Sequence, residues 1–122
     1  MNKKTVIIGA TPNRSRYAYL AAGMLLEYHN PIVPVGIKQG EVYGENILPI
    51  NDRLPIEGVD TVTLYIGPRH QPEHYDYIIS LKPKRVIFNP GTENEEFEKL
   101  IEASGAVALE ACTLVMLRSG QY

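Results

Sequence analysis

Short runs of apolar, often β-branched residues recur along the chain, and most of them are apolar at consecutive positions. They lie at Thr5–Ile8, Ile32–Val35, Thr61–Ile66, Arg85–Phe88 and Ala106–Leu109. A strand that faces water on one side alternates apolar and polar residues, whereas a strand covered on both faces does not. The pattern therefore predicts five strands of a sheet that is buried on both sides.

Segments with helical spacing separate several of these runs, at Arg16–Tyr28, Gln71–Leu81 and Glu95–Ala103. In the first segment, one face is expected to carry Tyr17, Leu20, Ala21, Met24 and Leu25. Buried strands that alternate with helices are typical of a parallel sheet with helices on both faces. We therefore expect a single α/β domain over residues 1–122, doubly wound and Rossmann-like, with a mostly parallel five-stranded sheet.

The stretch Gly36–Pro55 interrupts this alternation, because it is rich in Gly, Pro and Asn where a crossover helix would be expected. We expect a long connection there, with a short extra strand near Ile47–Pro49. The length of 122 residues suits one hydrophobic core. Neither an internal repeat nor a low-complexity tract divides the chain.

Composition does not alter the predicted fold, but it excludes some kinds of binding partner. The formal net charge of -2 gives no general attraction to nucleic acid or anionic membrane. No apolar run approaches the roughly 18 residues of a membrane span, and the first run is too short for a signal peptide. Cys112 is the single cysteine, which excludes an internal disulfide. We expect a cytoplasmic protein that binds neither nucleic acid nor membrane.

Glycines and basic residues gather where the predicted strands end, which is the ligand side of an open parallel sheet. The four segments that follow strands are Gly9–Arg14, Gly36–Lys38, Gly67–Arg69 and Asn89–Gly91. Glycine lets the backbone approach a ligand closely, and a helix that starts near Ser15 points free N–H groups at an anion. Hydroxyls of Thr11 and Ser15, with Arg14 or Arg16, would complete a phosphate site.

The sequence of the first loop, G-A-T-P-N-R-S-R, matches neither common phosphate-binding fingerprint. The second strand is followed by V-P-V-G-I-K-Q, which has no acid to bind a free ribose hydroxyl before Glu41. Lys38 would instead attract a phosphorylated ribose, as in coenzyme A (CoA) or NADP. The missing glycines of the dinucleotide fingerprint weigh against NADP.

Several motifs in order carry a family resemblance, among them V-I-I-G-A-T-P-N-R-S-R-Y, I-V-P-V, V-Y-G and R-V-I-F-N-P-G-T-E-N-E-E. The chain resembles stand-alone CoA-binding proteins, which are similar to the CoA-binding domain of the succinyl-CoA synthetase α subunit. It departs from the family pattern where Gly36–Ile37 replaces Asn-Pro, and where Asn89–Pro90 replaces a Gln before the glycine.

The resemblance implies that Ala10–Arg14 cradles the CoA diphosphate and that Lys38 lies near the 3′-phosphate. It also implies that Ile66–Pro68 flanks the adenine and that Asn89–Gly91 lies near the pantetheine arm. The expected binding residues are Gly9, Ala10, Thr11, Pro12, Asn13, Arg14, Ser15, Arg16, Pro34, Val35, Gly36, Lys38, Ile66, Gly67, Pro68, Asn89, Pro90 and Gly91.

The sequence offers no clear catalytic constellation. His70 and His74 are spaced as metal ligands on a helix would be, but we interpret them as an exposed helix start without metal. Cys112 lies near Glu110 in an apolar context, which favours packing over reactivity. We expect non-catalytic binding of CoA or an acyl-CoA. The alternatives are an NADP-dependent oxidoreductase domain and a degenerate interaction module without ligand, and a homodimer is plausible.

Overall fold

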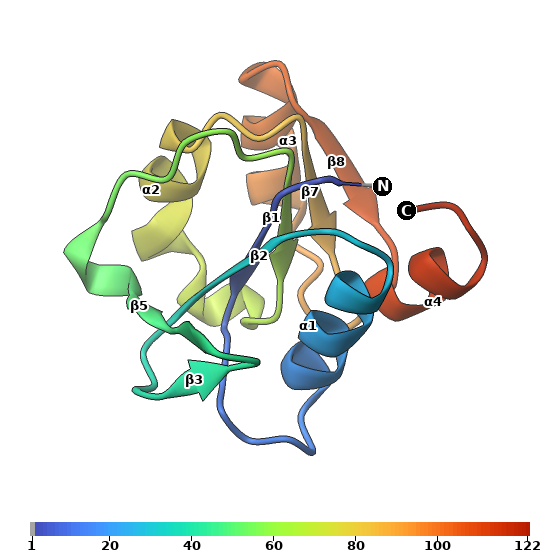
Figure 1. The fold of residues 1–122 in the computed structure, drawn as a ribbon. Helices are drawn as coiled ribbons and strands as arrows, with labels where there is room; N and C mark the ends of the chain where they lie inside the picture. Colours follow the sequence, from blue (N-terminus) through green and yellow to red (C-terminus); the bar gives the residue numbers. More distant parts are fainter. Residues whose placement is uncertain (1) are drawn as a thin grey trace.

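A sheet of six strands forms the centre of the computed structural model, which describes residues 2–122. The strands are β1 (Thr5–Ile8), β2 (Ile32–Gly36), β5 (Leu48–Pro49), β6 (Thr61–Leu64), β7 (Arg85–Phe88) and β8 (Val107–Glu110). They lie in the order β5-β2-β1-β6-β7-β8, and every neighbouring pair is parallel (Figure 1). The Rossmann-like prediction is confirmed, with six strands in place of five because Leu48–Pro49 joins the edge beside β2.

The order of the strands reverses at β1, which pairs with β2 on one side and with β6 on the other. Ile8 at the end of β1 lies opposite both Val35 and Leu64. The carboxyl ends of these strands therefore reach the same edge of the sheet. In doubly wound folds the ligand binds at this reversal point, beyond the carboxyl ends of the strands.

Helices cover both faces of the sheet, as the alternating sequence pattern predicts. In Figure 1, α1 (Tyr17–Glu27) and α4 (Thr113–Arg118) lie on the right of the sheet, and α2 (Tyr75–Ser80) and α3 (Glu95–Ala103) on the left. Adjacent residues of β1 point to opposite faces of the sheet. Ile7 belongs to the hydrophobic cluster under α1, and Ile8 to the cluster under α2 and α3. Both side chains are fully buried.

The predicted buried face of α1 is partly wrong. Ala21 and Leu25 are buried as expected, but Tyr17 is 71% exposed and Leu20 45% exposed, and the helix also buries Ala18 and Ala22. Nearly every position of this helix is apolar or small, so the spacing of apolar residues does not single out one face. The alanines face the sheet, and their small side chains let the helix pack close to it.

The predicted helix Gln71–Leu81 starts only at Tyr75. Two short 3₁₀ turns precede it, η2 (Pro68–His70) and η3 (Pro72–His74), and each begins with a proline. Proline is favoured in the first turn of a helix, but in the interior it interrupts the helix because it has no N–H group to donate. The segment from Gly67 to His74 therefore runs as two tight turns along the ligand edge of the sheet.

Smaller differences concern the element ends and the last helix. The strand expected over Thr61–Ile66 ends at Leu64, and the last strand is displaced by one residue, to Val107–Glu110. Sequence analysis missed α4, which buries Thr113, Met116 and Leu117 in a mostly apolar segment. Such a segment carries too little periodicity to distinguish a helix from a strand.

The long connection after β2 contains a small hairpin, β3 (Glu41–Val42) and β4 (Glu45–Asn46), followed by the turn η1 (Ile50–Asp52). The ring of Tyr43 lies against Tyr19 of α1, with the ring centres 4.8 Å apart. A methyl group on Gly23 would lie 2.5 Å from the Tyr43 hydroxyl oxygen, so the tyrosine ring occupies the space that a larger residue at this helix position would need. The hairpin thus packs onto α1, at the lower left of the sheet in Figure 1.

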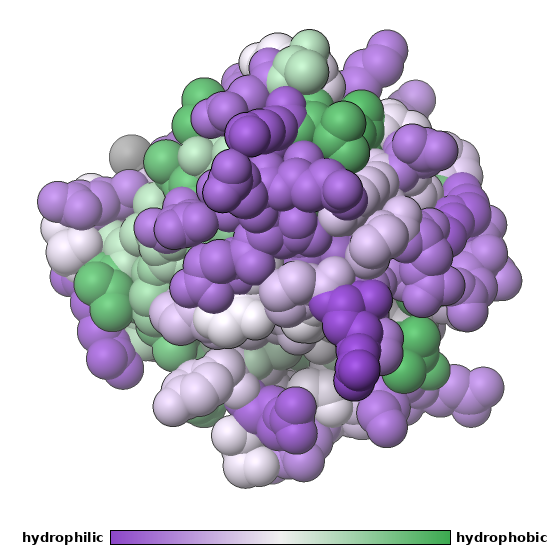
Figure 2. All heavy atoms as spheres, turned by 180° about the vertical axis from the view of Figure 1, so that it is seen from behind, coloured by the Kyte–Doolittle hydropathy of each residue, from purple (hydrophilic) through white to green (hydrophobic). Residues whose placement is uncertain are grey.

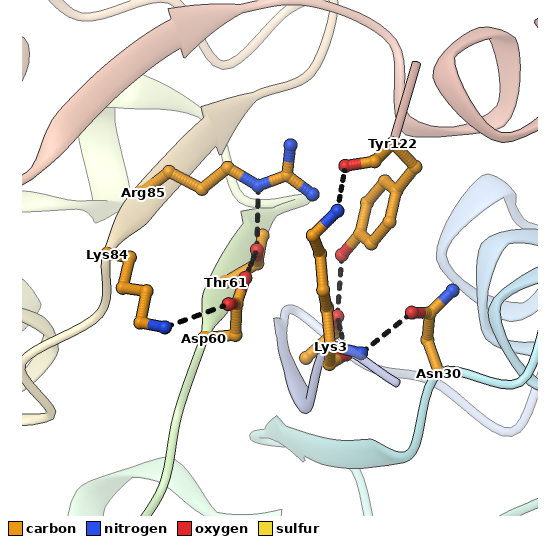
Figure 3. A network of polar contacts seen from close by, with 8 residues as sticks. Lys3, Asn30, Asp60, Thr61, Lys84, Arg85 and Tyr122 are labelled. Atoms are coloured by element: carbon orange, nitrogen blue, oxygen red, sulfur yellow. Dashed lines mark hydrogen bonds and ion pairs between the residues drawn. The ribbon is translucent and has the colours of Figure 1, made fainter. Parts of the chain in front are cut away.

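Polar side chains fill the opposite edge of the sheet, at the amino ends of the strands (Figure 3). The hydroxyls of Tyr122 and Thr5 are hydrogen-bonded at 2.5 Å, and Arg85 Nε donates to Thr61 Oγ1 at 2.7 Å. The Arg85 guanidinium also lies over the Tyr122 ring, 4.3 Å from its centre. Side chains of the protein itself thus cover the sheet at the amino ends of these strands. Within residues 2–122, no helix has the length and apolar character needed to cross a membrane.

Candidate functional site

A cleft of about 940 Å³ lies at the carboxyl edge of the sheet. Its walls are the loops that follow β1, β2, β6 and β7, together with residues of η1, η2 and η3. Its volume lies within the roughly 300–1,000 Å³ that is usual for small-molecule and cofactor sites. The position agrees with the reversal of strand order beside β1.

The loop after β1 is held in place by its own hydrogen bonds. The N–H groups of Gly9 and Ala10 both donate to the Val35 carbonyl oxygen, at 2.9 and 3.0 Å. Asn13 Oδ1 accepts from the N–H and the hydroxyl of Ser15, at 3.0 and 2.8 Å. The loop leads into α1, whose N-terminus carries no side-chain cap. An uncapped helix N-terminus with free N–H groups favours an anion.

Two glycines allow the strand ends to approach one another closely. Gly9 has φ +97°, and a Cβ there would lie 3.0 Å from the carbonyl group of Tyr65. A Cβ on Gly36 would lie 2.8 Å from the backbone oxygen of Ala10. The loop after β1 passes directly over Gly36, and this close contact leaves no room for a side chain at the position.

The charges of the cleft are arranged unevenly. Arg16 and Lys38 line it near the loop after β1, and Glu73 is the one acid among the described lining residues. Arg14 does not line this cleft, although the sequence offered it as a phosphate partner. It lines a separate hollow of about 440 Å³ with Pro12, Tyr19, Glu41, Tyr43 and Gly44. The Arg and Lys side chains that line the main cleft, among the described residues, are thus Arg16 and Lys38.

His74 lies in the other part of the cleft and is 5% exposed, so the prediction of an exposed helix start is wrong for this residue. Arg53 Nη1 lies 2.7 Å from His74 Nδ1. Burial lowers the pKa of His74, and the neighbouring Arg53 guanidinium lowers it further. His70 lines the cleft and is exposed, as expected. No three of the His, Cys, Asp and Glu side chains in residues 2–122 are grouped to hold a metal ion.

Gln71 joins the loops after β6 and β7. Its side chain is fully buried, and Nε2 donates to the carbonyl oxygens of Ile66 and Thr92 at 3.0 and 2.8 Å. Asn94 Nδ2 donates to Gln71 Oε1 at 2.9 Å. Ile66 and Thr92 both line the cleft, so Gln71 fixes the spacing of two of its walls.

Asn89 does not line the cleft, in contrast to the expectation that it lies near the pantetheine arm. Its side chain is buried, and Nδ2 donates to Thr63 Oγ1 and the Leu64 carbonyl oxygen at 2.7 and 2.8 Å. Its Oδ1 accepts from the Thr113 N–H at 2.9 Å. Asn89 therefore links β6, β7 and α4, and Pro90 and Gly91 beside it line the cleft.

The cleft brings together most of the predicted residues, namely Gly9, Ala10, Thr11, Pro12, Asn13, Arg16, Gly36, Lys38, Ile66, Gly67, Pro90 and Gly91. Pro34 and Val35 are buried in β2, and Ser15 and Pro68 are exposed outside the lining. The lining residues that sequence analysis did not assign are Tyr17, Ala18, Ile37, Gln39, Ile50, Tyr65, His70, Glu73, His74 and Thr92. Tyr17, Ile37 and Tyr65 adjoin predicted loops, so a wider window would have found them.

Comparison with known proteins supports the fold and the type of site. A family model described as the CoA binding domain matches residues 3–118. A solved crystal structure of an uncharacterized protein is 56% identical, with a TM-score of 0.97, and the match covers 100% of this chain and 99% of that one. No curated protein matches.

Two further similar structures come from thermophilic organisms. A hypothetical protein from Pyrococcus horikoshii OT3 is 27% identical with a TM-score of 0.86, over 97% of this chain and 83% of that one. A structure from Thermus thermophilus, cell-free ID.343, shares the fold at 24% identity and a TM-score of 0.86, over 99% and 91% of the two chains. With the family match over nearly its whole length, the chain belongs to the CoA binding domain family.

Proposed function

We propose that this chain binds CoA or an acyl-CoA in the cleft through the phosphates and adenosine, without catalysing a reaction itself. The observation that carries the proposal is the fixed loop Gly9–Asn13, which leads to the uncapped N-terminus of α1 beside Arg16 and Lys38. This arrangement combines the uncapped first turn of α1 with two cations, which suits a ligand with several phosphates.

The residues of the cleft suggest an orientation for the ligand. The diphosphate would lie over the loop Ala10–Asn13, and the 3′-phosphate would pair with Lys38. The adenine would lie beside Ile66 and Gly67, and the pantetheine arm would continue past Pro90 and Gly91. Each of these protein residues lines the cleft.

The proposal is limited to binding because of the hydrogen bonds in the described part of the chain. There, neither His70 nor His74 is hydrogen-bonded to a hydroxyl or thiol that it could activate. The alternative of an empty interaction module would favour a continuous apolar surface. Figure 2 shows one face of the molecule, on which hydrophilic atoms predominate and hydrophobic atoms form smaller groups.

The test is a calorimetric and thermal-shift titration with CoA, 3′-dephospho-CoA, acetyl-CoA, NADP and NAD. A ligand at ~100 times its dissociation constant should stabilise the fold by roughly 2.7 kcal/mol. We expect CoA and acetyl-CoA to bind more tightly than 3′-dephospho-CoA, and Lys38→Ala to abolish that difference.

The matched control is Arg14→Ala, which removes a cation of the loop after β1 that lies outside the cleft. It should preserve the preference for the 3′-phosphate. Binding of NADP in place of CoA would support the oxidoreductase alternative. An absence of stabilisation by every one of these ligands at millimolar concentration would reject the proposal.

A further inference from the structure

The cleft extends across the edge of the sheet, from the α1 face to the α2 face. The loop after β1 continues into α1, whose Ala18 and Leu25 pack on one face of the sheet. Ile50 packs on the other face with Tyr77 of α2, and both Ile50 and His74 line the cleft. A ligand anchored by its phosphates near α1 can therefore reach a second set of residues on the α2 face.

The contacts of Arg53 fix the tautomer of His74. A guanidinium only donates hydrogen bonds, so the contact at 2.7 Å requires His74 Nδ1 to accept. The proton of the neutral ring is then on Nε2. Arg53 is itself held in place, since it also donates to the carbonyl oxygens of Ile50 at 3.2 Å and Glu73 at 2.6 Å.

The Nε2–H group has no hydrogen-bond partner among the described residues. The nearest acid oxygen, Glu73 Oε1, lies 3.8 Å away, which is beyond hydrogen-bond distance. The His74 side chain is only 7% exposed, and Ile50 and Ile66 line the same cleft. Nε2 is nevertheless open to the cleft, because Arg85 Nη2 is the one buried side-chain nitrogen or oxygen of the described residues that lacks a partner. An acceptor supplied by the ligand could therefore reach this N–H group and take the place of water.

Charges of both signs lie around His74, with the Arg53 guanidinium at Nδ1 and the Glu73 carboxylate near Nε2. The ring is neutral at neutral pH, because burial and Arg53 both lower its pKa. At Nε2 the Glu73 carboxylate would repel an anionic oxygen, whereas Arg53 on the other side of the ring would attract one, so the charges alone do not favour a phosphate there. A phosphate is better placed at the other end of the cleft, beside Arg16 and Lys38.

We propose that His74 Nε2–H donates a hydrogen bond to an uncharged carbonyl oxygen of the bound ligand, and that Arg53 positions His74 for this role. The inference rests on the proposed function, since it assumes a ligand whose phosphates occupy the loop after β1. In a CoA ligand the carbonyl belongs either to the thioester of an acyl group or to an amide of the pantetheine arm.

The experiment compares the wild-type chain with His74→Phe, which keeps a planar ring but has no N–H group, and with His74→Gln, which keeps an amide donor. Each is titrated with CoA, with acetyl-CoA and with adenosine 3′-phosphate 5′-diphosphate, which lacks pantetheine. We expect His74→Phe to weaken CoA or acetyl-CoA about tenfold, as for one lost hydrogen bond to a buried group, and to leave the pantetheine-free nucleotide unchanged. His74→Gln should retain most of the affinity.

The pattern of losses identifies the carbonyl. A loss for acetyl-CoA alone assigns it to the thioester, and an equal loss for both CoA and acetyl-CoA assigns it to pantetheine. Wild-type affinity of His74→Phe for all three ligands would overturn the inference while leaving the proposed function intact. Failure of the wild-type chain to bind any of the three would instead reject the proposed function and the inference with it.

A second measurement does not depend on a variant that folds. Long-range proton–nitrogen correlation spectra of the ¹⁵N-histidine-labelled wild-type chain distinguish the two neutral tautomers. We expect Nε2 of His74 to carry the proton, and its resonance to move when CoA or acetyl-CoA is added but not with the pantetheine-free nucleotide. A proton on Nδ1, or an Nε2 resonance that none of the ligands moves, would overturn the inference.

Discussion

At the α1 end of the cleft, the lining residues Gly9–Asn13 and Arg16–Ala18 are close neighbours in the chain. At the α2 end, Ile50, Ile66 and His74 come from three separate segments. The first end is shaped mainly by backbone hydrogen bonds, glycines and the start of a helix. The second is shaped by side chains that bridge segments, chiefly Gln71 and Arg53.

This difference has an energetic consequence. Backbone geometry at the α1 end persists when an exposed side chain is removed, because the loop is fixed by its N–H groups. At the α2 end the buried side chains are themselves the connections, so removing one leaves buried polar groups without a partner. We expect the two ends to respond differently to the same kind of substitution.

The largest expected effect is on stability at the α2 end. Gln71→Ala removes three hydrogen bonds, two donated to the carbonyl oxygens of Ile66 and Thr92 and one accepted from Asn94, and should lower the free energy of unfolding by about 3 kcal/mol. The comparison variant Asn13→Ala removes hydrogen bonds of an exposed loop and should cost less than about 1 kcal/mol. Urea unfolding of both variants measures the difference, and equal losses would refute the contrast between the two ends.

A smaller loss of stability is expected at the α1 end, where the backbone at Gly36 lies close to the backbone of Ala10. Gly36→Ala places a methyl group 2.8 Å from the Ala10 carbonyl oxygen and should cost about 2 kcal/mol. Gly67→Ala is the control, since its Cβ would meet no atom within 4 Å and its φ of -67° suits alanine. We expect Gly67→Ala to unfold at the same urea concentration as the wild type or a higher one. If Gly36→Ala does so too, the close approach is not a constraint.

For ligand affinity, the expected effect is again confined to one end. Arg16→Ala should weaken CoA about tenfold, because one charge-assisted contact to a phosphate is lost, and should reduce the dependence of binding on salt. Arg14→Ala, outside the cleft, should change the affinity less than threefold, within the modest effect of a distant surface charge. Calorimetry at two salt concentrations checks both. Equal effects of the two variants on CoA affinity would show that a cation inside the cleft contributes no more than one outside it.

The smallest expected effect is a change in how stability depends on pH. Because the pKa of His74 is lower in the folded chain, the unfolded chain binds a proton more readily as the pH falls below about 6.5. The stability that His74 contributes is therefore complete above this pH and is lost as the pH falls toward the folded pKa. Burial lowers that pKa most, Arg53 and His70 lower it further, and Glu73 raises it.

His74→Gln removes this titration, so its melting temperature should fall less steeply than that of the wild type between pH 7 and the acidic range. Thermal unfolding at a series of pH values measures the two slopes. Parallel slopes would show that His74 is not held in its neutral form by the fold.

Much of the fold could be predicted because it is written in short, contiguous patterns. The bounds of Thr5–Ile8, Arg85–Phe88 and Glu95–Ala103 agree with the structure, because the two strands are short runs of mostly apolar residues and the helix has apolar residues at helical spacing. Where most residues are apolar or small, as in α1 and α4, the period is hidden, so that the buried face of α1 was predicted only in part and α4 was missed. The family resemblance implied that Asn89 lies near the ligand, but a position on a loop does not fix the direction of its side chain.

The sequence by itself determined the parallel sheet, the edge at which its strands end, and the loop Gly9–Arg16 as the candidate phosphate site. These features follow from local spacing and from the conformational freedom of glycine. The tertiary structure alone decided which cation faces the cleft, Arg16 or Arg14, and brought Arg53 to His74 across 21 positions of the chain. The physical reason is that a side chain's direction and its burial depend on contacts between distant segments, which no local pattern records.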